Sequence, residues 1–166
     1  YALSFGKNEM PGYHTGPATY IGYICGARHS HLDNAGYSVD QKPTENYPKT
    51  PENVADELYE EEVYRQILSS LVVCFFARGL YTREIIEEVL AVCGVSMTVD
   101  ELDALGRSIL AEKYRFKCRE GFSLAPDSVH IPRRILEIPS GHGMIQEDEI
   151  RRGVARYKEL LEKKLL

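Results

Sequence analysis

Residues 51–72 read PENVADELYEEEVYRQILSSLV, and this stretch decides the fold class. Pro51 is favoured at the first position of a helix, and acidic residues in the first two turns suit the positive end of the helix dipole. Apolar side chains then recur at helical spacing: Leu58, Val63, Ile67, Leu68, Leu71 and Val72. The pattern predicts one long amphipathic helix that ends at Gly79, with the glutamates of 60–62 on its solvated face.

Capping signals predict two further helices downstream. Thr82 can cap a helix that ends at Gly94, with one apolar face formed by Ile85, Ile86, Val89, Leu90 and Cys93. Thr98 and Glu101 form a capping box, because each side chain can satisfy the other's free backbone amide. The helix that follows ends at Gly121 and carries apolar side chains at helical spacing: Leu102, Leu105, Ile109, Leu110, Tyr114 and Phe116.

The two ends of the chain complete an all-α, multihelical fold. Residues 1–16 are rich in Gly, Pro and Tyr and are typical of an extended arm, and residues 18–27 are almost wholly apolar, which predicts a buried helix. Residues 122–146 are irregular, and an amphipathic helix follows from about Glu147 to the C-terminus. No strand pair is predicted. We expect residues 1–50 to supply an arm, a buried helix and a loop, and residues 51–166 to form a helical bundle continuous with them.

Composition narrows the class of function. The 166 residues carry a net charge of −5 without a Lys/Arg-rich stripe, which argues against nucleic acid as the main partner. No apolar run approaches the roughly 20 residues that span a bilayer. The first residue is Tyr1, so we expect either a processed product or a piece of a longer chain.

The four cysteines lack the short Cys-x2-Cys or Cys-x4-Cys pair that zinc and iron–sulfur sites usually contain. Cys74 and Cys93 lie in apolar contexts, so we expect both to be buried free thiols. So few cysteines in a chain of this length favour a reducing, cytoplasmic setting.

The densest polar cluster follows the apolar segment and contains His29, His31, Asp33 and Asp40. Two histidines at i and i+2 do not share a helix face, although an irregular segment would let them ligate a metal or flank a substrate. A hydrogen-bonded structural histidine explains the same pattern. A neutral imidazole is nonetheless the most versatile proton carrier near pH 7.

Four stretches, taken in order, resemble the C-terminal region of the tungsten-pterin aldehyde:ferredoxin oxidoreductase family. EMPGY at 9–13 looks like the opening of the family's last domain, and GARH at 26–29 looks like its Gly-Ala-x-His element. LVVCF at 71–75 is similar to the cluster-ligand segment. REGF at 119–122, followed by IPRR at 131–134, is similar to the most specific signature, Arg-Glu-Gly-Phe then Leu-Pro-x-Arg.

The resemblance implies a parent enzyme that oxidises aldehydes to carboxylic acids with water as the oxygen source. Such an enzyme holds tungsten, or molybdenum, between two pterins and passes electrons through a [4Fe–4S] cluster to a ferredoxin-like carrier. His29 would be the catalytic imidazole beside the metal, and Cys74 would be one thiolate ligand of the cluster, carried by a helix. The remaining cysteines, most of the pterin cradle and a catalytic glutamate would belong to N-terminal domains, so this chain alone is expected to be inactive.

The sequence also departs from the family pattern. The family reads Asp-x-x-Gly-Leu-Cys where this chain reads SSLVVC at 69–74, so Ser69 replaces an aspartate that contacts a pterin. Val73 lies beside the ligand in the same segment, and His31 stands where a pterin-contacting basic residue is common. Cys25 replaces an arginine that commonly precedes Gly-Ala. These differences indicate a divergent branch, whose substrate need not be a simple aldehyde.

Two other hypotheses remain open from the residues alone. The chain could be a free-standing helical interaction module without a cofactor, with residues 18–27 in contact with a partner. It could also be a small metal-dependent enzyme that uses His29, His31 and Asp33.

Overall fold

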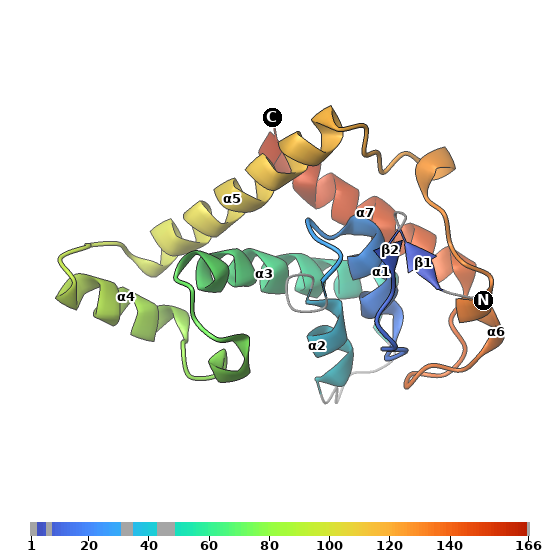
Figure 1. Cartoon of the computed structure of the whole chain (residues 1–166), viewed down its shortest axis with the longest axis horizontal. Helices are drawn as coiled ribbons and strands as arrows, with labels where there is room; N and C mark the ends of the chain where they lie inside the picture. The colour runs from blue at the N-terminus through green and yellow to red at the C-terminus, as the bar shows by residue number, and fades with distance from the viewer. Residues whose placement is uncertain (1–2, 6–7, 31–34, 43–48, 166) are drawn as a thin grey trace.

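The computed structural model describes residues 3–5, 8–30, 35–42 and 49–165, and its described residues are mainly helical. Its α-helices are, in chain order, α1 (Pro17–Cys25), α2 (Gly36–Gln41), α3 (Pro51–Ser70), α4 (Arg83–Val92), α5 (Val99–Arg119), α6 (Arg134–Glu137) and α7 (Glu147–Leu165). Two 3-10 turns are η1 (Phe75–Ala77) and η2 (Pro126–Ser128). The predicted all-α fold is confirmed (Figure 1).

One short β-hairpin was not predicted. Strands β1 (Ser4–Phe5) and β2 (Asn8–Glu9) pair antiparallel within the segment expected to be an extended arm. Phe5 is buried and its ring lies 5.9 Å from that of Tyr20 in α1. The arm therefore folds back onto the buried helix.

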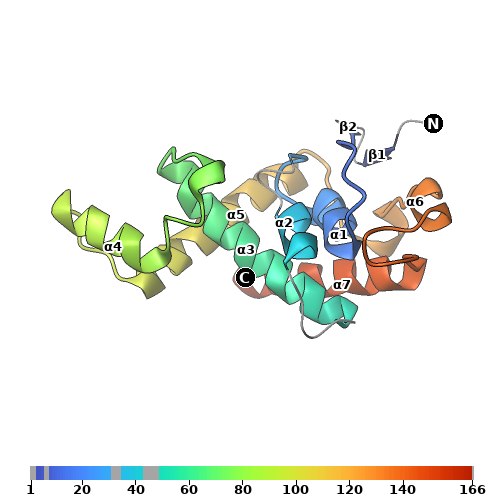
Figure 2. The ribbon, with the colours of Figure 1, turned by 90° about the horizontal axis from the view of Figure 1, so that it is seen from below.

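Helix α3 is the central element, and α1, α5 and α7 pack against it (Figures 1 and 2). Thr50 caps its start by accepting a hydrogen bond from the Asn53 backbone N–H at 3.2 Å, and Pro51 occupies the first turn. The main hydrophobic core contains residues from both sides of residue 50, such as Tyr20 and Leu58. A smaller second cluster contains Ile67, Leu68, Ile86 and Leu102.

The buried helix α1 packs closely against α2 and α7. A Cβ atom added at Gly36 in α2 would lie 2.3 Å from the carbonyl oxygen of Ala18. A Cβ atom added at Gly153 in α7 would lie 2.3 Å from Cδ1 of Ile21. The absence of side chains at these two glycines is therefore what allows α2 and α7 to approach α1.

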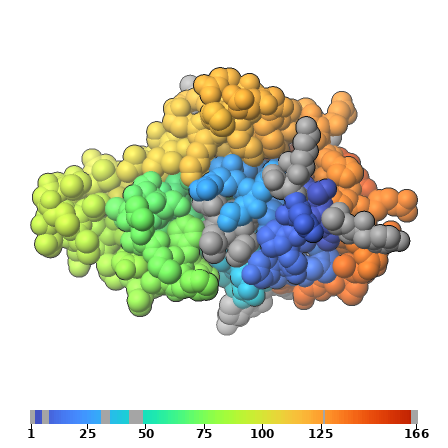
Figure 3. Space-filling view, viewed as in Figure 1, coloured from blue at the N-terminus to red at the C-terminus, as the bar shows by residue number. Residues whose placement is uncertain are grey.

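Helix α4 lies at one end of the molecule, away from the hairpin and α6, and protrudes at the left of the space-filling view (Figures 2 and 3). Thr82 caps it as predicted, and Thr98 and Glu101 form the predicted capping box of α5. The predicted apolar face of α4 is only partly buried: Ile86 is buried and Leu90 is half-buried, but Ile85 and Val89 are exposed. Two predicted core positions of α5, Leu105 and Phe116, are likewise exposed.

None of the helices formed by the described residues combines the length and apolar character needed to cross a membrane.

Candidate functional site

The loop that carries His29 begins where α1 ends. The backbone N–H of Gly26 closes the helix by donating to the carbonyl oxygen of Gly22 at 2.7 Å, and the backbone at Gly26 then becomes extended. His29 follows in a bent segment and is half-buried. His31 and Asp33, the other two residues of the predicted cluster, lie outside the described residues.

Side chains from α3 and α5 bind the peptide unit between Gly26 and Ala27, and a side chain from α7 binds one of them. The Lys117 ammonium group in α5 donates a hydrogen bond to the carbonyl oxygen of Gly26 at 2.7 Å. The N–H of Ala27 donates to Oε1 of Glu62 in α3 at 2.8 Å. The hydroxyl of Tyr157 in α7 donates to Oε2 of the same carboxyl group. We call Glu62, Lys117 and Tyr157 the peptide clamp.

Glu62 is fully buried, so the prediction that residues 60–62 form a solvated face is wrong at this position. Helical spacing places Glu62 four residues after Leu58 and seven after Ala55, both of which are buried. Glu62 thus falls on the inner face of α3. A search for charged residues on an apolar face would have found it, as it would have found Lys117, three residues after buried Tyr114.

Burial sets the protonation behaviour of this region. It raises the pKa of Glu62, while the Tyr157 hydroxyl, the Ala27 N–H and the Lys117 charge pull that pKa back down. Burial lowers the pKa of Lys117, and the nearby Glu62 charge opposes this shift. The pKa of His29 is lowered by partial burial and then by the Lys117 charge. These effects favour a neutral His29 imidazole near pH 7, the form that can accept a proton.

Two predictions about buried thiols are wrong. Cys74 and Cys93 are exposed, and Cys25, at the end of α1, is the buried cysteine. The apolar run at 71–76 does not continue the helix, and Cys93 lies just beyond the last turn of exposed α4, so neither thiol reaches the core. Burial and the Glu62 charge raise the pKa of Cys25 well above its usual value, which keeps that thiol protonated.

Helix α3 ends at Ser70 rather than at the predicted Gly79. We call residues 71–78, which follow it, the Cys74 turn. Val72 N–H donates to the Ser69 carbonyl oxygen and Val73 N–H to that of Leu68, the hydrogen bonds of a Schellman motif. Val72 occupies the left-handed position of that motif, with φ of +57°. A β-branched residue is strained there, and glycine is the usual occupant.

This geometry bears on the comparison with the family motif Asp-x-x-Gly-Leu-Cys. The glycine of that motif stands at the position of Val72, where the backbone here has the conformation that favours glycine. Cys74 is carried by the turn after α3 and starts η1, with its carbonyl oxygen accepting from Ala77 N–H at 2.9 Å, so it is not carried by a helix as predicted.

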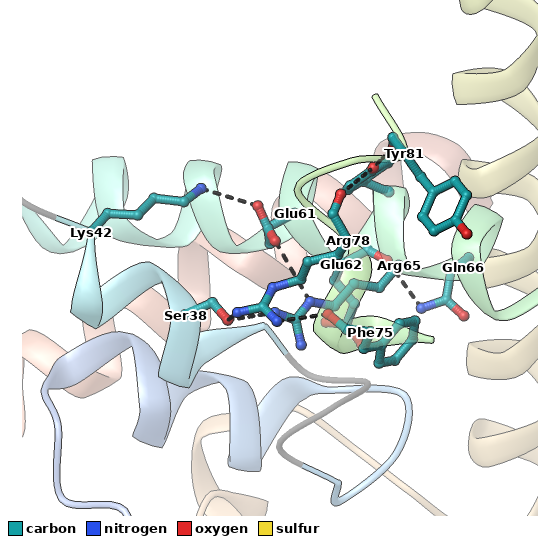
Figure 4. A network of polar contacts seen from close by, with 10 residues as sticks. Ser38, Lys42, Glu61, Glu62, Arg65, Gln66, Phe75, Arg78 and Tyr81 are labelled. Atoms are coloured by element: carbon teal, nitrogen blue, oxygen red, sulfur yellow. Dashed lines mark hydrogen bonds and ion pairs between the residues drawn. The ribbon is translucent and has the colours of Figure 1, made fainter. Parts of the chain in front are cut away.

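Two arginines surround the residue after Cys74 (Figure 4). The Arg78 guanidinium donates to the carbonyl oxygen of Phe75 at 2.7 Å, and the buried Arg65 guanidinium lies 5.8 Å from the Phe75 ring centroid. Both arginines also donate to the hydroxyl of Ser38 in α2, at 2.6 Å from Arg65 and 3.5 Å from Arg78. Arg78 therefore joins the turn to α2, and Arg65 joins it to α3.

Helix α3 brings the His29 loop and the Cys74 turn together. Glu62, which contacts the loop, and Arg65, which contacts the turn, are three residues apart on this helix, so their Cβ atoms are about 5–6 Å apart. Ser69 is half-buried in the last turn of α3, and Val73 is half-buried against the second hydrophobic cluster.

Asp40 lies away from His29, at the opposite end of α1. Its carboxylate accepts hydrogen bonds from the backbone N–H groups of Ala18 and Thr19, at 3.0 and 2.9 Å, and from the Thr19 hydroxyl at 2.7 Å. It therefore caps the N-terminus of the helix whose C-terminus leads to His29. Burial raises its pKa, and these hydrogen bonds oppose the shift.

The segment with the most specific family signature lines a pocket. Glu120, Gly121 and Phe122 border a cavity together with Phe5 and Ile24. Gly121 has φ of +89°, a conformation that favours glycine. The signature thus lies beside the end of α1, and the Phe122 ring centroid lies 3.7 Å from the Lys117 ammonium nitrogen of the peptide clamp.

Within the described ranges, no group of three or more His, Cys, Asp or Glu side chains is placed to hold a metal ion. Cys74 is exposed, and the next residue, Phe75, is the one that contacts the two guanidinium groups.

The chain is a multihelical domain in which residues of the His29 loop and of the Cys74 turn both contact α3. Residues 1–163 match the family model described as aldehyde ferredoxin oxidoreductase, domains 2 and 3. The chain therefore belongs to the aldehyde ferredoxin oxidoreductase family. No curated protein and no solved structure matches it.

Proposed function

We propose that this chain is the C-terminal portion of a tungsten- or molybdenum-bis-pterin oxidoreductase that converts aldehydes to carboxylic acids. The observation that carries the proposal is the family match over residues 1–163. The matching model describes domains 2 and 3, which supports an N-terminal part that completes the enzyme. On its own the chain would then be inactive. Residues 1–50 and 51–166 would act as one continuous unit, since they share the main core.

The reaction adds water to an aldehyde and releases two electrons and two protons with the acid. When bound, the metal–pterin group supplies the oxidation, and a [4Fe–4S] cluster passes the electrons to a ferredoxin-type carrier. His29 would accept one of the protons at an imidazole nitrogen. Its lowered pKa supports this role, because a neutral imidazole at pH 7 has a free lone pair for the proton.

Cys74 would supply one thiolate to the cluster, and the other three ligands would come from the N-terminal part. Arg65 and Arg78 would hold the turn that carries Cys74 through their contacts with Phe75. His31, Ser69 and Val73 would contact the pterin, as the family resemblance implies.

Exposed apolar side chains support an interface with the N-terminal domains. Val72 and Phe76, on either side of Cys74, are 90% and 91% exposed, and Val92 at the end of α4 is 89% exposed. Burying this surface would be favourable at roughly 25 cal/mol for each Å² removed from water. A cytoplasmic location would suit the free thiols and the ferredoxin-type carrier.

Reading the gene upstream of Tyr1 tests the proposal first. We expect a Cys-x2-Cys-x3-Cys pattern within the same reading frame. A start codon just before Tyr1 would contradict the proposal and would favour a free-standing helical interaction module, whose partner would cover the exposed apolar residues.

Substitution of His29 tests the chemistry in the complete enzyme. We expect His29→Ala to abolish aldehyde oxidation while the pterin content stays that of the unmodified enzyme, because the imidazole moves a proton and does not hold the metal. Retention of full turnover in this variant would remove His29 from the mechanism.

A further inference from the structure

We propose that Glu62, Lys117 and Tyr157 are positioning residues that fix the Gly26–Ala27 peptide and thereby the direction of the His29 imidazole. The inference rests on the proposed catalytic role of His29 and adds the residues that place it. Its geometric basis is that Gly26 C=O and Ala27 N–H belong to one peptide plane. Lys117 binds the oxygen of that plane and Glu62 binds its N–H.

Two opposed contacts on one peptide plane determine how that plane is oriented. A single hydrogen bond leaves the plane free to tilt about the bond, whereas bonds at both its oxygen and its nitrogen remove that freedom. The next peptide leads directly to Arg28 and His29, so the orientation of this plane sets the direction in which the chain leaves α1. The loop residues before His29 therefore depend on α3 and α5 rather than on α1 alone.

Tyr157 fixes the carboxyl group itself. Its hydroxyl binds the second oxygen of Glu62, and its ring packs at 5.7 Å, edge to face, against Tyr59 of α3. Lys117 is similarly enclosed, with its ammonium nitrogen 3.7 Å from the Phe122 ring centroid and 5.3 Å from that of Tyr114. Tyr157 and Lys117 are thus held in place by aromatic packing as well as by their polar partners.

The composition of the clamp points to positioning rather than to stability. Replacing a buried ion pair by apolar residues of similar volume often leaves stability unchanged or improves it, because charges are costly to remove from water. Glu62 is nevertheless fully buried and Lys117 half-buried, and the charge of Glu62 acts on Lys117. A precise backbone geometry near a proton-transfer group explains why charged side chains occur there.

The test uses the 166-residue chain and nuclear magnetic resonance, so it does not depend on turnover. In Glu62→Ala we expect the Ala27 amide to exchange with solvent about tenfold faster, because its acceptor is removed. Glu62→Gln keeps a carbonyl oxygen at this position and should restore most of the protection. Glu61→Gln is the matched control, since the neighbouring Glu61 pairs with Lys42 and Arg65 outside the clamp.

A second pair of variants leaves α3 intact, in case Glu62→Ala fails to fold. Lys117→Met keeps the length of the side chain but removes the charge that helps to lower the pKa of His29. We expect the pKa of His29 to rise in this variant and the His29 ring signals to shift. Lys113→Met is the control, one turn earlier on α5, because Lys113 binds Gln66 and not the Gly26 carbonyl oxygen. It should leave the pKa and the ring signals of His29 unchanged.

Two results would overturn the inference. One is an Ala27 exchange rate in folded Glu62→Ala equal to that of the unmodified chain. The other is a His29 pKa and ring position that are the same in Lys117→Met and Lys113→Met. Because both readouts concern this chain alone, a His29→Ala enzyme with full turnover would contradict the proposed function without changing either of them.

Discussion

The His29 loop and the Cys74 turn contact adjacent turns of α3, yet they differ in how this chain supports them. The His29 loop is bound by side chains of α3 and α5, because buried Glu62 and half-buried Lys117 bind the two polar groups of its Gly26–Ala27 peptide. The Cys74 turn is fixed on one side by Arg65 and Arg78, and exposed apolar residues flank it on the other.

The difference indicates which part of the site is complete within this chain. Within the described residues, both polar groups of the Gly26–Ala27 peptide have partners in this chain, which suits a loop whose histidine moves a proton in a fixed direction. The turn lacks a cover over Val72 and Phe76, which suits a ligand that completes a group held mainly by another part of the protein. Substitutions that disturb the packing of α1, the helix that leads to the loop, should therefore cost much stability, and substitutions of exposed residues on the other side should cost little.

The largest loss is expected where α2 meets α1. In Gly36→Ala the new Cβ would lie 2.3 Å from the Ala18 carbonyl oxygen, which is backbone and has no flexible side chain to move aside. We expect a loss of about 4 kcal/mol in the free energy of unfolding, measured by urea denaturation. Gly12→Ala is the control, because nothing lies within 4 Å of the added Cβ there. Equal stability of the two variants would show that the support of α1 is not rigid.

The next largest effect concerns the cap of α1. Asp40→Ala removes the acceptor of two buried backbone N–H groups, and we expect a loss of about 3 kcal/mol. Asp40→Asn retains one acceptor oxygen and should lose less. Thermal unfolding measures both variants. A loss below about 0.5 kcal/mol for Asp40→Ala would mean that the cap contributes little.

Substitutions in α4, the helix that follows the Cys74 turn, test the side of the molecule that has more exposed apolar residues. Ile86→Ala should lose about 2 kcal/mol, since Ile86 is buried in the second cluster, whereas Val92→Ala should change stability by less than about 0.5 kcal/mol. Amide exchange should show that the loss in Ile86→Ala is concentrated in α4 and the start of α5. Equal losses in both variants would contradict the exposure of Val92.

The smallest effect is a gain, at the end of α3. Val72→Gly relieves the left-handed backbone conformation of Val72, and we expect the chain to become more stable by about 1 kcal/mol. Val89→Gly, at an exposed position inside α4, is the control and should instead lose a similar amount, because glycine is unfavourable within a helix. A loss of stability in Val72→Gly would contradict the Schellman geometry that places Cys74.

Periodicity and capping residues were sufficient to predict the long helices, because burial on one face and a free N-terminus both leave local patterns. Thr82, Thr98 and Pro51 begin helices where expected. The end of α3 could not be predicted, because Val72 adopts a conformation that its residue type disfavours.

The residues around the candidate site were harder to predict. Glu62 and Lys117 meet Ala27 and Gly26 only through tertiary contacts between residues 35 and 91 positions apart in the sequence. A run of three glutamates is usually solvated, and the neighbouring residues do not indicate that one of the three accepts a hydrogen bond from a distant backbone amide. Asp40 was grouped with His29 by nearness in the sequence, although α1 separates the two in space.

The electron paramagnetic resonance spectrum of the reduced complete enzyme tests the central claim most directly, that Cys74 gives this chain's one thiolate to an iron–sulfur cluster. Cys74→Ser should alter the cluster signal and its redox potential, while Cys93→Ser, which changes another exposed cysteine, should leave both as they are. A cluster spectrum and potential unchanged by Cys74→Ser would contradict the claim.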